Sequence, residues 1–346
     1  MKKGALLRGI NIILFFGLGV VLMYFAFKNV EFSFLMEGLS KANYSWLVIS
    51  LLVGIVAFLA RALRWRLLIE PLGYRPTVMN AFHAITIGYL ANFAFPRAGE
   101  VSRCGVLRKT EKIPFESLIG TVIVERTFDL LCLLILLVTV FFLKVDFFGK
   151  FIYDTALLPI TKKFAGFGGS YLAFLIVILP IIIALFVAYI FRYKLIRFGI
   201  IRKMIRLARG VIKGLKTGFT MERRLEFLLF TLLIWASYLT MTWVIFYTLP
   251  ATSSLGFVDA LFILAISSIG MTVPVQGGFG AFHIIVATGL TMYGISREDG
   301  LLYATISHES QTIMTIIIGV ISLSYLFFKK RNNPVIATSH EQVQER

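Results

Sequence analysis

The sequence predicts an all-α polytopic membrane protein with about six full spans and two broken re-entrant segments in an inverted-repeat arrangement. Of the 346 residues, 58% are hydrophobic and only 15% are charged, and the mean hydropathy is +0.85. A soluble domain of this size could not cover its surface with polar groups at that composition. The charges also fall between long apolar runs, and proline and glycine interrupt two of those runs.

Six segments are long and apolar enough to cross a bilayer, which needs about 20 mostly apolar residues. No small-residue cleavage site follows the first of them, so we expect a membrane anchor and not a removable signal peptide. In chain order the six spans cover roughly residues 10–27, 44–60, 117–143, 171–191, 226–248 and 301–328.

Basic residues flanking the spans predict their orientation, because cytoplasmic loops carry an excess of Lys and Arg. Such residues lie at 2–8 before the first span and at 329–331 after the last, which places both termini in the cytoplasm. The basic cluster at 61–75, which includes Arg61 and Arg64, returns the chain to the cytoplasm after the second span. We therefore expect a multi-pass protein of the cell inner (plasma) membrane.

Two further apolar stretches, roughly 80–95 and 260–293, are broken by proline and glycine. The first has arginines on both flanks, so a segment that enters from the cytoplasm and turns back explains the charges better than a full crossing. The second is broken at Pro274 and has an acidic far flank, which predicts re-entry from the outside. If both segments crossed instead, the chain would have eight spans.

The two broken segments resemble each other. The first runs from Asn80 to Pro96 in sixteen residues, and the second runs from Asp259 to Pro274 in fifteen. Each then reads Pro-x-x-Gly, and a long span with ionisable residues inside it follows. Matching interrupted segments in two halves of opposite orientation are typical of inverted-repeat transporters. One departure is that residues 101–107 are too short and polar to mirror 281–293 well.

We expect one integral membrane domain and no separate soluble domain. The domain covers residues 1–331, with a first half at about 1–143 and a second half at about 171–331. The second half includes a basic amphipathic surface helix at about 200–218. A disordered cytoplasmic tail follows at 332–346.

Backbone groups freed at the breaks cannot face lipid, because each unsatisfied group costs several kcal/mol there. They must be buried in protein or line a wet cavity. The glycine-rich stretch 277–280 lets backbone approach a ligand closely and opens a new helix at about Ala281, whose free N–H groups favour an anion such as a lipid phosphate. The alternative is that this stretch is a packing hinge.

Ionisable residues lie inside the third span. Glu125, Arg126 and Asp129 are eight to twelve residues into it, which is roughly 12–18 Å from its cytoplasmic end. Charged groups there cost about 2.5–3.5 kcal/mol each, so they should face the protein interior, with Arg126 and Asp129 paired at i, i+3. Arg126, or Arg97 and Arg103, would present positive charge to a phosphate. A purely structural ion pair is the alternative.

His308 and Glu309 lie near the middle of the last span and, with His283, would line a polar cavity. Their spacing is not a recognised ligand pattern, so we predict no metal and no cofactor. The formal net charge of +17 falls between apolar runs and indicates anionic lipid, not nucleic acid, as the partner. The candidate substrate-binding residues are Asn92, Arg97, Glu100, Arg103, Glu125, Arg126, Asp129, Gln276, Gly277, Gly278, Gly280, His283, His308 and Glu309.

Four stretches together resemble the lysylphosphatidylglycerol synthase transmembrane, or flippase-like, domain family. They are "RALRWRLLI" at 61–69, "IGYLANFAFPRAGEVSR" at 87–103, "GTVIVERTFDLL" at 120–131 and "PVQGGFGAFH" at 274–283. The resemblance covers nearly the whole chain and implies a polytopic lipid-translocating module. The family includes members fused to a synthase domain and members that stand alone. This chain matches only the membrane part, so we expect a stand-alone member without aminoacyl transfer.

The resemblance also implies which residues are functional. Two positions depart from the family's pattern: Gln276 stands where proline is common, and His283 stands where an acidic residue is frequent. The residues that fall on the family's polar positions are Asn92, Pro96, Arg97, Gly99, Glu100, Arg103, Glu125, Arg126 and Asp129.

The function expected from these observations is a flippase or transporter, not an enzyme. It would move an anionic or modified lipid between leaflets through a polar cavity between the two broken helices. One alternative is an intramembrane lipid-modifying transferase that uses Glu100, Glu125 or Glu309 as acid or base. Another is a non-transporting membrane partner of a separate lipid-modifying enzyme, and a homo-oligomer is compatible with all three.

Overall fold

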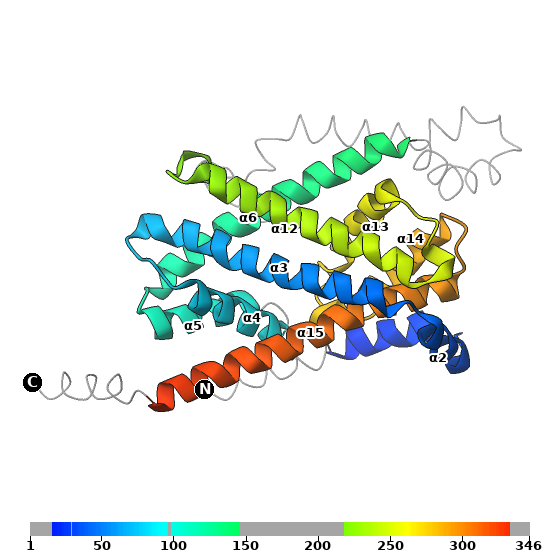
Figure 1. Ribbon diagram of the computed structural model, residues 1–346, viewed down its shortest axis with the longest axis horizontal. Helices are drawn as coiled ribbons and strands as arrows, with labels where there is room; N and C mark the ends of the chain where they lie inside the picture. The colour runs from blue at the N-terminus through cyan, green and yellow to red at the C-terminus, as the bar shows by residue number, and fades with distance from the viewer. Residues whose placement is uncertain (1–15, 29, 96–97, 146–217, 333–346) are drawn as a thin grey trace, which may run out of the picture.

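The computed structural model describes residues 16–28, 30–95, 98–145 and 218–332, and all regular structure in these ranges is helical. The helices form an elongated bundle (Figure 1). Three sequence predictions fall outside the described residues, apart from residues 218 and 332 at their edges. These are the span at 171–191, the surface helix at about 200–218 and the tail at 332–346.

Four helices of the described part are long and apolar enough to cross a membrane. They confirm a helical membrane protein, since even 22 helical residues extend about 33 Å, slightly more than the hydrocarbon core of a bilayer. Two shorter apolar helices are Phe16–Phe27 and α13 (Phe257–Gly270). The four long helices are α3 (Tyr44–Ile69), α6 (Phe115–Leu143), α12 (Arg224–Ile245) and α15 (Arg297–Asn332).

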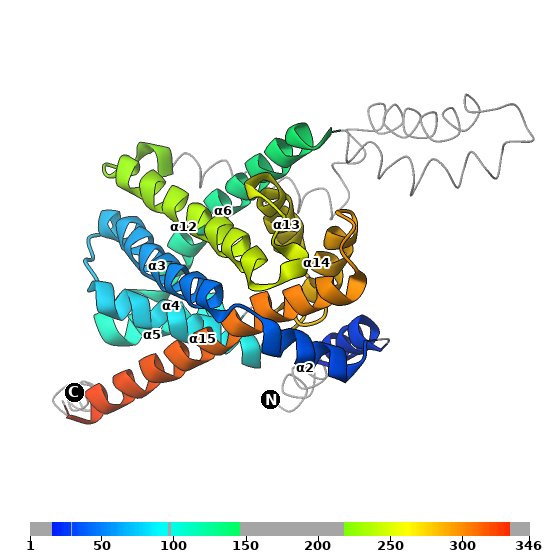
Figure 2. The same ribbon diagram turned by 45° about the vertical axis from the view of Figure 1, so that its right-hand side comes forward.

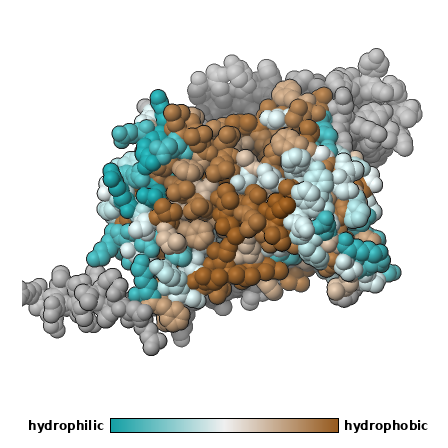
Figure 3. Space-filling view, viewed as in Figure 1, coloured by the Kyte–Doolittle hydropathy of each residue, from teal (hydrophilic) through white to brown (hydrophobic). Residues whose placement is uncertain are grey.

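The long helices expose large apolar side chains around the middle of the bundle. Examples are Val138 on α6, Leu229 on α12 and Ile321 on α15, all exposed. Figure 3 shows the resulting hydrophobic band between two more hydrophilic ends. A soluble protein rarely exposes an apolar surface of this extent, whereas lipid chains cover it at little cost.

The second span is longer than the sequence predicted. We ended it at residue 60, before the first arginine, but α3 continues to Ile69 and is followed by a short turn, η1 (Glu70–Leu72). The prediction was wrong because it placed Arg61 and Arg64 in a surface loop. Both arginines are buried inside the bundle instead.

The first broken segment folds back on itself. α4 (Val78–Ala94) and α5 (Gly99–Glu111) lie antiparallel, because Asn80 near the start donates to Glu111 at the end over 2.7 Å. At the tip, the Gly99 amide donates to the Asn92 side chain over 2.7 Å. The chain therefore leaves this hairpin at the end where it entered. Residues 101–107, which we expected to match the second half poorly, belong to the 13-residue α5.

The arms of this hairpin touch backbone to backbone. A Cβ added at Gly99 would lie 2.5 Å from the Gly88 carbonyl oxygen, and one added at Gly88 would lie 2.8 Å from the Gly99 oxygen. We expect Gly99→Ala to lower the free energy of unfolding by about 1–3 kcal/mol, as overpacking does. Gly105→Ala in the same helix is the control, because nothing lies within 4 Å of its added Cβ. Equal thermal midpoints of the two variants in detergent would contradict the expectation.

The second broken segment is a hairpin of α13 and α14 (Ala281–Thr291), and α14 begins where the sequence predicted. The loop between them contains η6 (Gln276–Gly278) and three glycines with positive φ, at positions 277, 278 and 280. The tips of the two hairpins meet, since a Cβ on Gly277 would lie 2.6 Å from the ring of Phe93 in α4.

The two halves pack against each other reciprocally. α3 and α12 lie side by side and antiparallel (Figures 1 and 2). α6 packs on α13, where Lys144 pairs with Asp259 at 2.7 Å, and α15 packs on α4, where His83 contacts Ser322 at 2.9 Å. Helix pairs α5–α6 and α14–α15 also correspond. The contacts among α3, α4, α5 and α6 and across to α12, α13, α14 and α15 thus correspond in pairs.

Cysteine labelling tests the predicted topology directly. We expect a membrane-impermeant thiol reagent to label Glu298→Cys only from outside and Gly105→Cys only from the cytoplasm, in a background with Cys104→Ala and Cys132→Ser. Glu298 is exposed at the start of α15, and Gly105 has open space beside it. Labelling of position 105 from outside would overturn the re-entrant assignment of the first hairpin.

Candidate functional site

Glu125 is the centre of the most highly charged part of the bundle. It lies ten residues into α6, about 15 Å from that helix's start, and its side chain is 0% exposed. Four arginines contact it. Its Oε1 lies 3.2 Å from Arg61, 3.3 Å from Arg64 and 2.5 Å from Arg126, while its Oε2 lies 2.9 Å from Arg103 on α5.

Asp129, one turn further along α6, is the second carboxylate of this group. It lies 2.8 Å from Arg64, 3.5 Å from Arg61 and 3.2 Å from Arg126, the i, i+3 pair predicted from the sequence. Four arginines therefore share two carboxylates, which leaves two formal positive charges. We call this group the arginine cluster: Arg61, Arg64, Arg103, Glu125, Arg126 and Asp129.

Helix α12 holds the two arginines of α3 in place. Arg61 Nε donates to the hydroxyl of Tyr238 over 2.6 Å, and Arg64 Nη1 donates to Thr231 Oγ1 over 3.3 Å. Arg61 and Arg64 are three residues apart and so lie on the same face of α3. A guanidinium fixed on one edge presents its remaining donors in a defined direction, which suits recognition of an oxyanion.

The cluster is buried except on one side. The guanidinium of Arg103 lies over the Trp65 ring at 4.6 Å, and Arg64 has no exposed side-chain surface. Arg126 differs, because 42% of its side chain is exposed. Arg64 Nε and Arg103 Nη2 also have no hydrogen-bond acceptor among the described residues. The cluster therefore has spare donors inside and one accessible cation at its edge.

Sequence reasoning missed Arg61 and Arg64 as site residues. Their signal was present: two arginines at i, i+3 directly after an apolar run, within the family-like stretch 61–69. We used them only to orient the chain, since a helix that ends before them leaves them at the surface. Tyr238 and Thr231 had no comparable signal, because hydroxyl residues are common in membrane helices.

Two predicted residues near the first break, Asn92 and Glu100, lie outside the cluster. Asn92 accepts the Gly99 amide and thereby closes the tip of the first hairpin, a structural role. Glu100 is half-buried in the first turn of α5, and none of the described side chains forms an ion pair with it. Arg97 falls outside the described residues.

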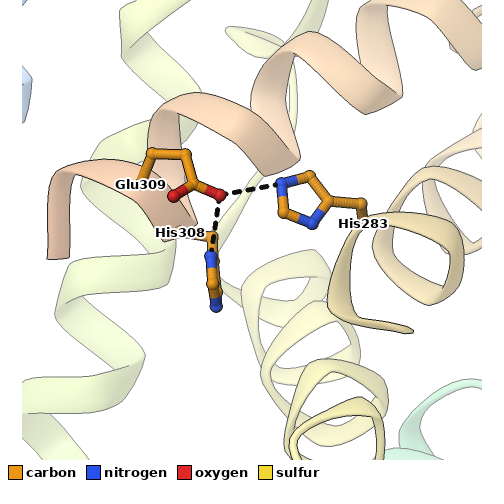
Figure 4. A group of neighbouring side chains, drawn as sticks. All are labelled: His283, His308 and Glu309. Carbon is orange, nitrogen blue, oxygen red and sulfur yellow. Dashed lines mark hydrogen bonds and ion pairs between the residues drawn. The ribbon is translucent and has the colours of Figure 1, made fainter. Parts of the chain in front are cut away.

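The second half contains a smaller polar group, the histidine cluster of His283, His308 and Glu309 (Figure 4). Glu309 Oε1 lies 3.0 Å from His308 Nδ1 and 3.3 Å from His283 Nε2. His308 Nε2 lies 2.7 Å from the Gly277 carbonyl oxygen. His283 comes from α14 and the other two from α15, and both histidines are buried.

The glycine-rich stretch of the second hairpin is packed against protein. A Cβ on Gly280 would lie 2.7 Å from the Met23 amide, and one on Gly278 would lie 2.5 Å from the Met271 sulfur. Gln276 is buried, and its Oε1 has no partner among the described residues. The backbone of this loop is therefore approached by the helix at Phe16–Phe27 and by neighbouring side chains, as expected of a packing hinge.

Seven of the fourteen predicted site residues thus fall into two groups. No hydrogen bond or ion pair between described residues joins the arginine cluster to the histidine cluster. Two cavities, of about 360 and 290 Å³, lie elsewhere: one is beside Lys28 and Arg297, and the other is beside Lys41 and Asp299.

A bundle of long apolar helices with an exposed hydrophobic band defines a multi-pass membrane protein. Comparison with known families agrees with this class. The chain belongs to the family of the lysylphosphatidylglycerol synthase transmembrane region, and the sequence model of that family matches residues 12–319.

Two curated proteins share shorter stretches with the chain. Glycosyltransferase AglD of Haloferax volcanii is 33% identical over 94 residues, which are 27% of this chain and 15% of AglD. UPF0104 membrane protein MJ1595 of Methanocaldococcus jannaschii is 30% identical over 94 residues, 26% of this chain and 28% of the relative. The matches thus span less than a third of either relative's length. No solved structure matches the chain significantly.

Proposed function

We propose that this protein is a lipid flippase that moves a lipid with an anionic headgroup between the leaflets of the cell membrane. The observation that carries the proposal is the arginine cluster, in which four guanidinium groups share two carboxylates inside the bundle. Guanidinium groups bind phosphate through paired, charge-assisted hydrogen bonds. A lipid phosphate is the anion that a membrane supplies in greatest amount at this site.

The charge imbalance favours ligand binding over a purely structural network. A structural network in a membrane would balance its charges, because each uncompensated arginine there costs about 2.5–3.5 kcal/mol on insertion scales. Two positive charges remain on the cluster, and Arg126 is accessible beside them. An anionic headgroup would neutralise the cluster and use donors of Arg64 and Arg103 that have no acceptor among the described residues.

The reciprocal packing supports an inverted-repeat transporter. In the two halves α3 corresponds to α12, the first hairpin to the second, and α6 to α15. The contacts among these helices are the same when the halves are exchanged. In such folds the substrate site lies where the repeats meet, and rocking of one repeat against the other exposes it to each side in turn. We propose six spans with two re-entrant hairpins and cytoplasmic termini, and we count among the six the span that the sequence predicts at 171–191.

A lipid-modifying transferase is the second candidate, favoured by the name of one relative, a glycosyltransferase. Among the three predicted acid–base residues, Glu125 is enclosed by arginines and Glu309 contacts two histidines. Glu100 is left as the carboxylate most available to a substrate. A non-transporting partner of a separate enzyme would bind the same anionic lipid at the arginine cluster without moving it between leaflets.

Reconstitution into liposomes distinguishes these functions. Liposomes with and without the purified protein would contain fluorescent phosphatidylglycerol or, for comparison, fluorescent phosphatidylcholine, and an impermeant reductant would bleach the outer leaflet. We expect the protein to speed movement of the anionic probe more than that of the zwitterionic one. Rates equal to those of protein-free liposomes would overturn the proposal. A new lipid species detected by mass spectrometry would instead support the transferase.

A further inference from the structure

We propose that the histidine cluster is a binding site for one divalent transition-metal ion of the zinc class. His283, His308 and Glu309 each offer one ligand atom, and these atoms all lie within 4.8 Å of one another. Two imidazoles and one carboxylate are a ligand set typical of Zn²⁺ sites with an open position. Figure 4 shows the three side chains converging from two helices.

The hydrogen bond between His308 and Gly277 indicates where the proton of His308 lies. Its Nε2 is 2.7 Å from the Gly277 carbonyl oxygen, which can only accept, so Nε2 carries a proton. In the neutral ring, Nδ1 then has a lone pair that faces Glu309 Oε1 at 3.0 Å. Two acceptors at this distance require a proton or a metal cation between them.

His283, in the tautomer that carries its proton on Nδ1, adds a third lone pair at the same point. Its Nε2 lies 3.3 Å from the same carboxylate oxygen, and its side chain is 0% exposed. Neither ring nitrogen of His283 has a well-aligned hydrogen bond to a described residue. A buried polar group without a partner costs about 1–3 kcal/mol. With the proton of the neutral His283 ring on Nδ1, a metal ion at this point would coordinate both histidines and the carboxylate.

Two of the three distances between the ligand atoms match a tetrahedral metal site, and all three lie within 4.8 Å. Two ligands about 2.0–2.1 Å from a tetrahedral zinc ion lie about 3.3 Å apart. The two nitrogen–oxygen distances in the cluster are 3.0 and 3.3 Å. Histidines that bind metals usually donate their other N–H to a carbonyl or carboxylate, as His308 does to Gly277.

Comparison of the two halves gives a further reason to expect a metal ion at the histidine cluster. Arg103–Glu125 joins α5 to α6, and His283–Glu309 joins the corresponding helices α14 and α15. Four permanent cations contact Glu125, whereas no lysine or arginine of the described residues pairs with Glu309. A bound metal ion would supply that positive charge. The sequence argued against a metal because the ligands lie on separate helices, at a spacing that matches no local motif.

The first test uses the unchanged protein, purified in detergent with a tag that contains no histidine. Metal content is measured by mass spectrometry, and the protein stripped with a chelator is titrated with Co²⁺ while visible absorption is recorded. We expect one equivalent of Co²⁺ with the absorption bands of tetrahedral or five-coordinate cobalt, displaced by Zn²⁺ but not by Mg²⁺. Absence of these bands together with a metal content equal to buffer would overturn the proposal and leave a shared proton.

Variants then locate the site. Glu309→Gln and His283→Gln should each weaken Co²⁺ binding by more than the roughly 10–100-fold caused by loss of a second-shell partner. His83→Gln is the matched control, because His83 is also buried and contacts α15, through Ser322, but is not part of the cluster. Unchanged binding in monodisperse Glu309→Gln protein would overturn the assignment. If that variant does not fold, the Co²⁺ titration of the unchanged protein decides alone.

Discussion

Replacing Glu125 with glutamine is expected to lower the free energy of unfolding by about 3–5 kcal/mol, as removal of one partner from a buried ion pair does. The physical reason is that the positive charge of the buried arginines remains after the negative charge of Glu125 is removed. Asp129 alone would remain to pair with three of the arginines, and Arg103 would lose its ion pair, in a part of the bundle where Glu125 itself has no exposed surface. Denaturation in increasing sodium dodecyl sulfate, followed by tryptophan fluorescence, measures the loss.

Glu226→Gln is the matched control for this experiment. Glu226 is also paired with an arginine, Arg223, but 46% of its side chain is exposed at the start of α12. Exposed ion pairs contribute about 0–1 kcal/mol, so this variant should unfold close to the wild-type midpoint. Equal losses in the two variants would contradict the view that Glu125 neutralises buried charge. Addition of an anionic phospholipid to Glu125→Gln should recover part of the stability, because it supplies negative charge.

The second large effect concerns transport. Arg126→Gln is expected to slow flipping of the anionic probe at least tenfold, since Arg126 is the accessible member of the arginine cluster. Its effect on stability should be smaller, within about 1 kcal/mol, because the other three arginines still neutralise Glu125 and Asp129. The liposome assay measures the rate, and gel filtration reports the folded fraction.

Two comparisons make the transport result specific. Arg223→Gln removes an arginine of similar exposure, 46%, that pairs with Glu70 and Glu226 away from the cluster, and it should flip lipid at the wild-type rate. Arg126→Lys keeps the charge but not the paired donors, so it should recover only part of the activity. A wild-type rate in Arg126→Gln would remove Arg126 from the headgroup site.

Most of the helices could be predicted from the sequence, because apolar runs of membrane length and proline–glycine breaks are local signals. The start of α14 at Ala281 and the returning first hairpin follow from such signals. The end of α3 could not be predicted by the same rule. Arg61 and Arg64 extend an apolar helix without interrupting it, since partners on other helices neutralise them.

The membership of each cluster depended on tertiary packing and was harder to predict. Arg126 and Asp129 are neighbours on one helix, and their pairing followed from spacing alone. His283 and Glu309 lie on different helices, and their approach to within 3.3 Å depends on how the second hairpin packs against α15. The contact of Asn92 with the Gly99 amide, which closes the tip of the first hairpin, likewise depends on the fold of the whole break.

The meeting of the hairpin tips at Phe93 and Gly277 has an electrical consequence. If water follows each hairpin inward from its own side, most of the membrane potential falls across the thin layer where the tips touch, not across about 30 Å of hydrocarbon. Each elementary charge carried across that layer changes the free energy by about 2.3 kcal/mol per 100 mV. The rate at which a charged headgroup passes should therefore depend steeply on voltage, even though its path through the insulating part of the protein is short.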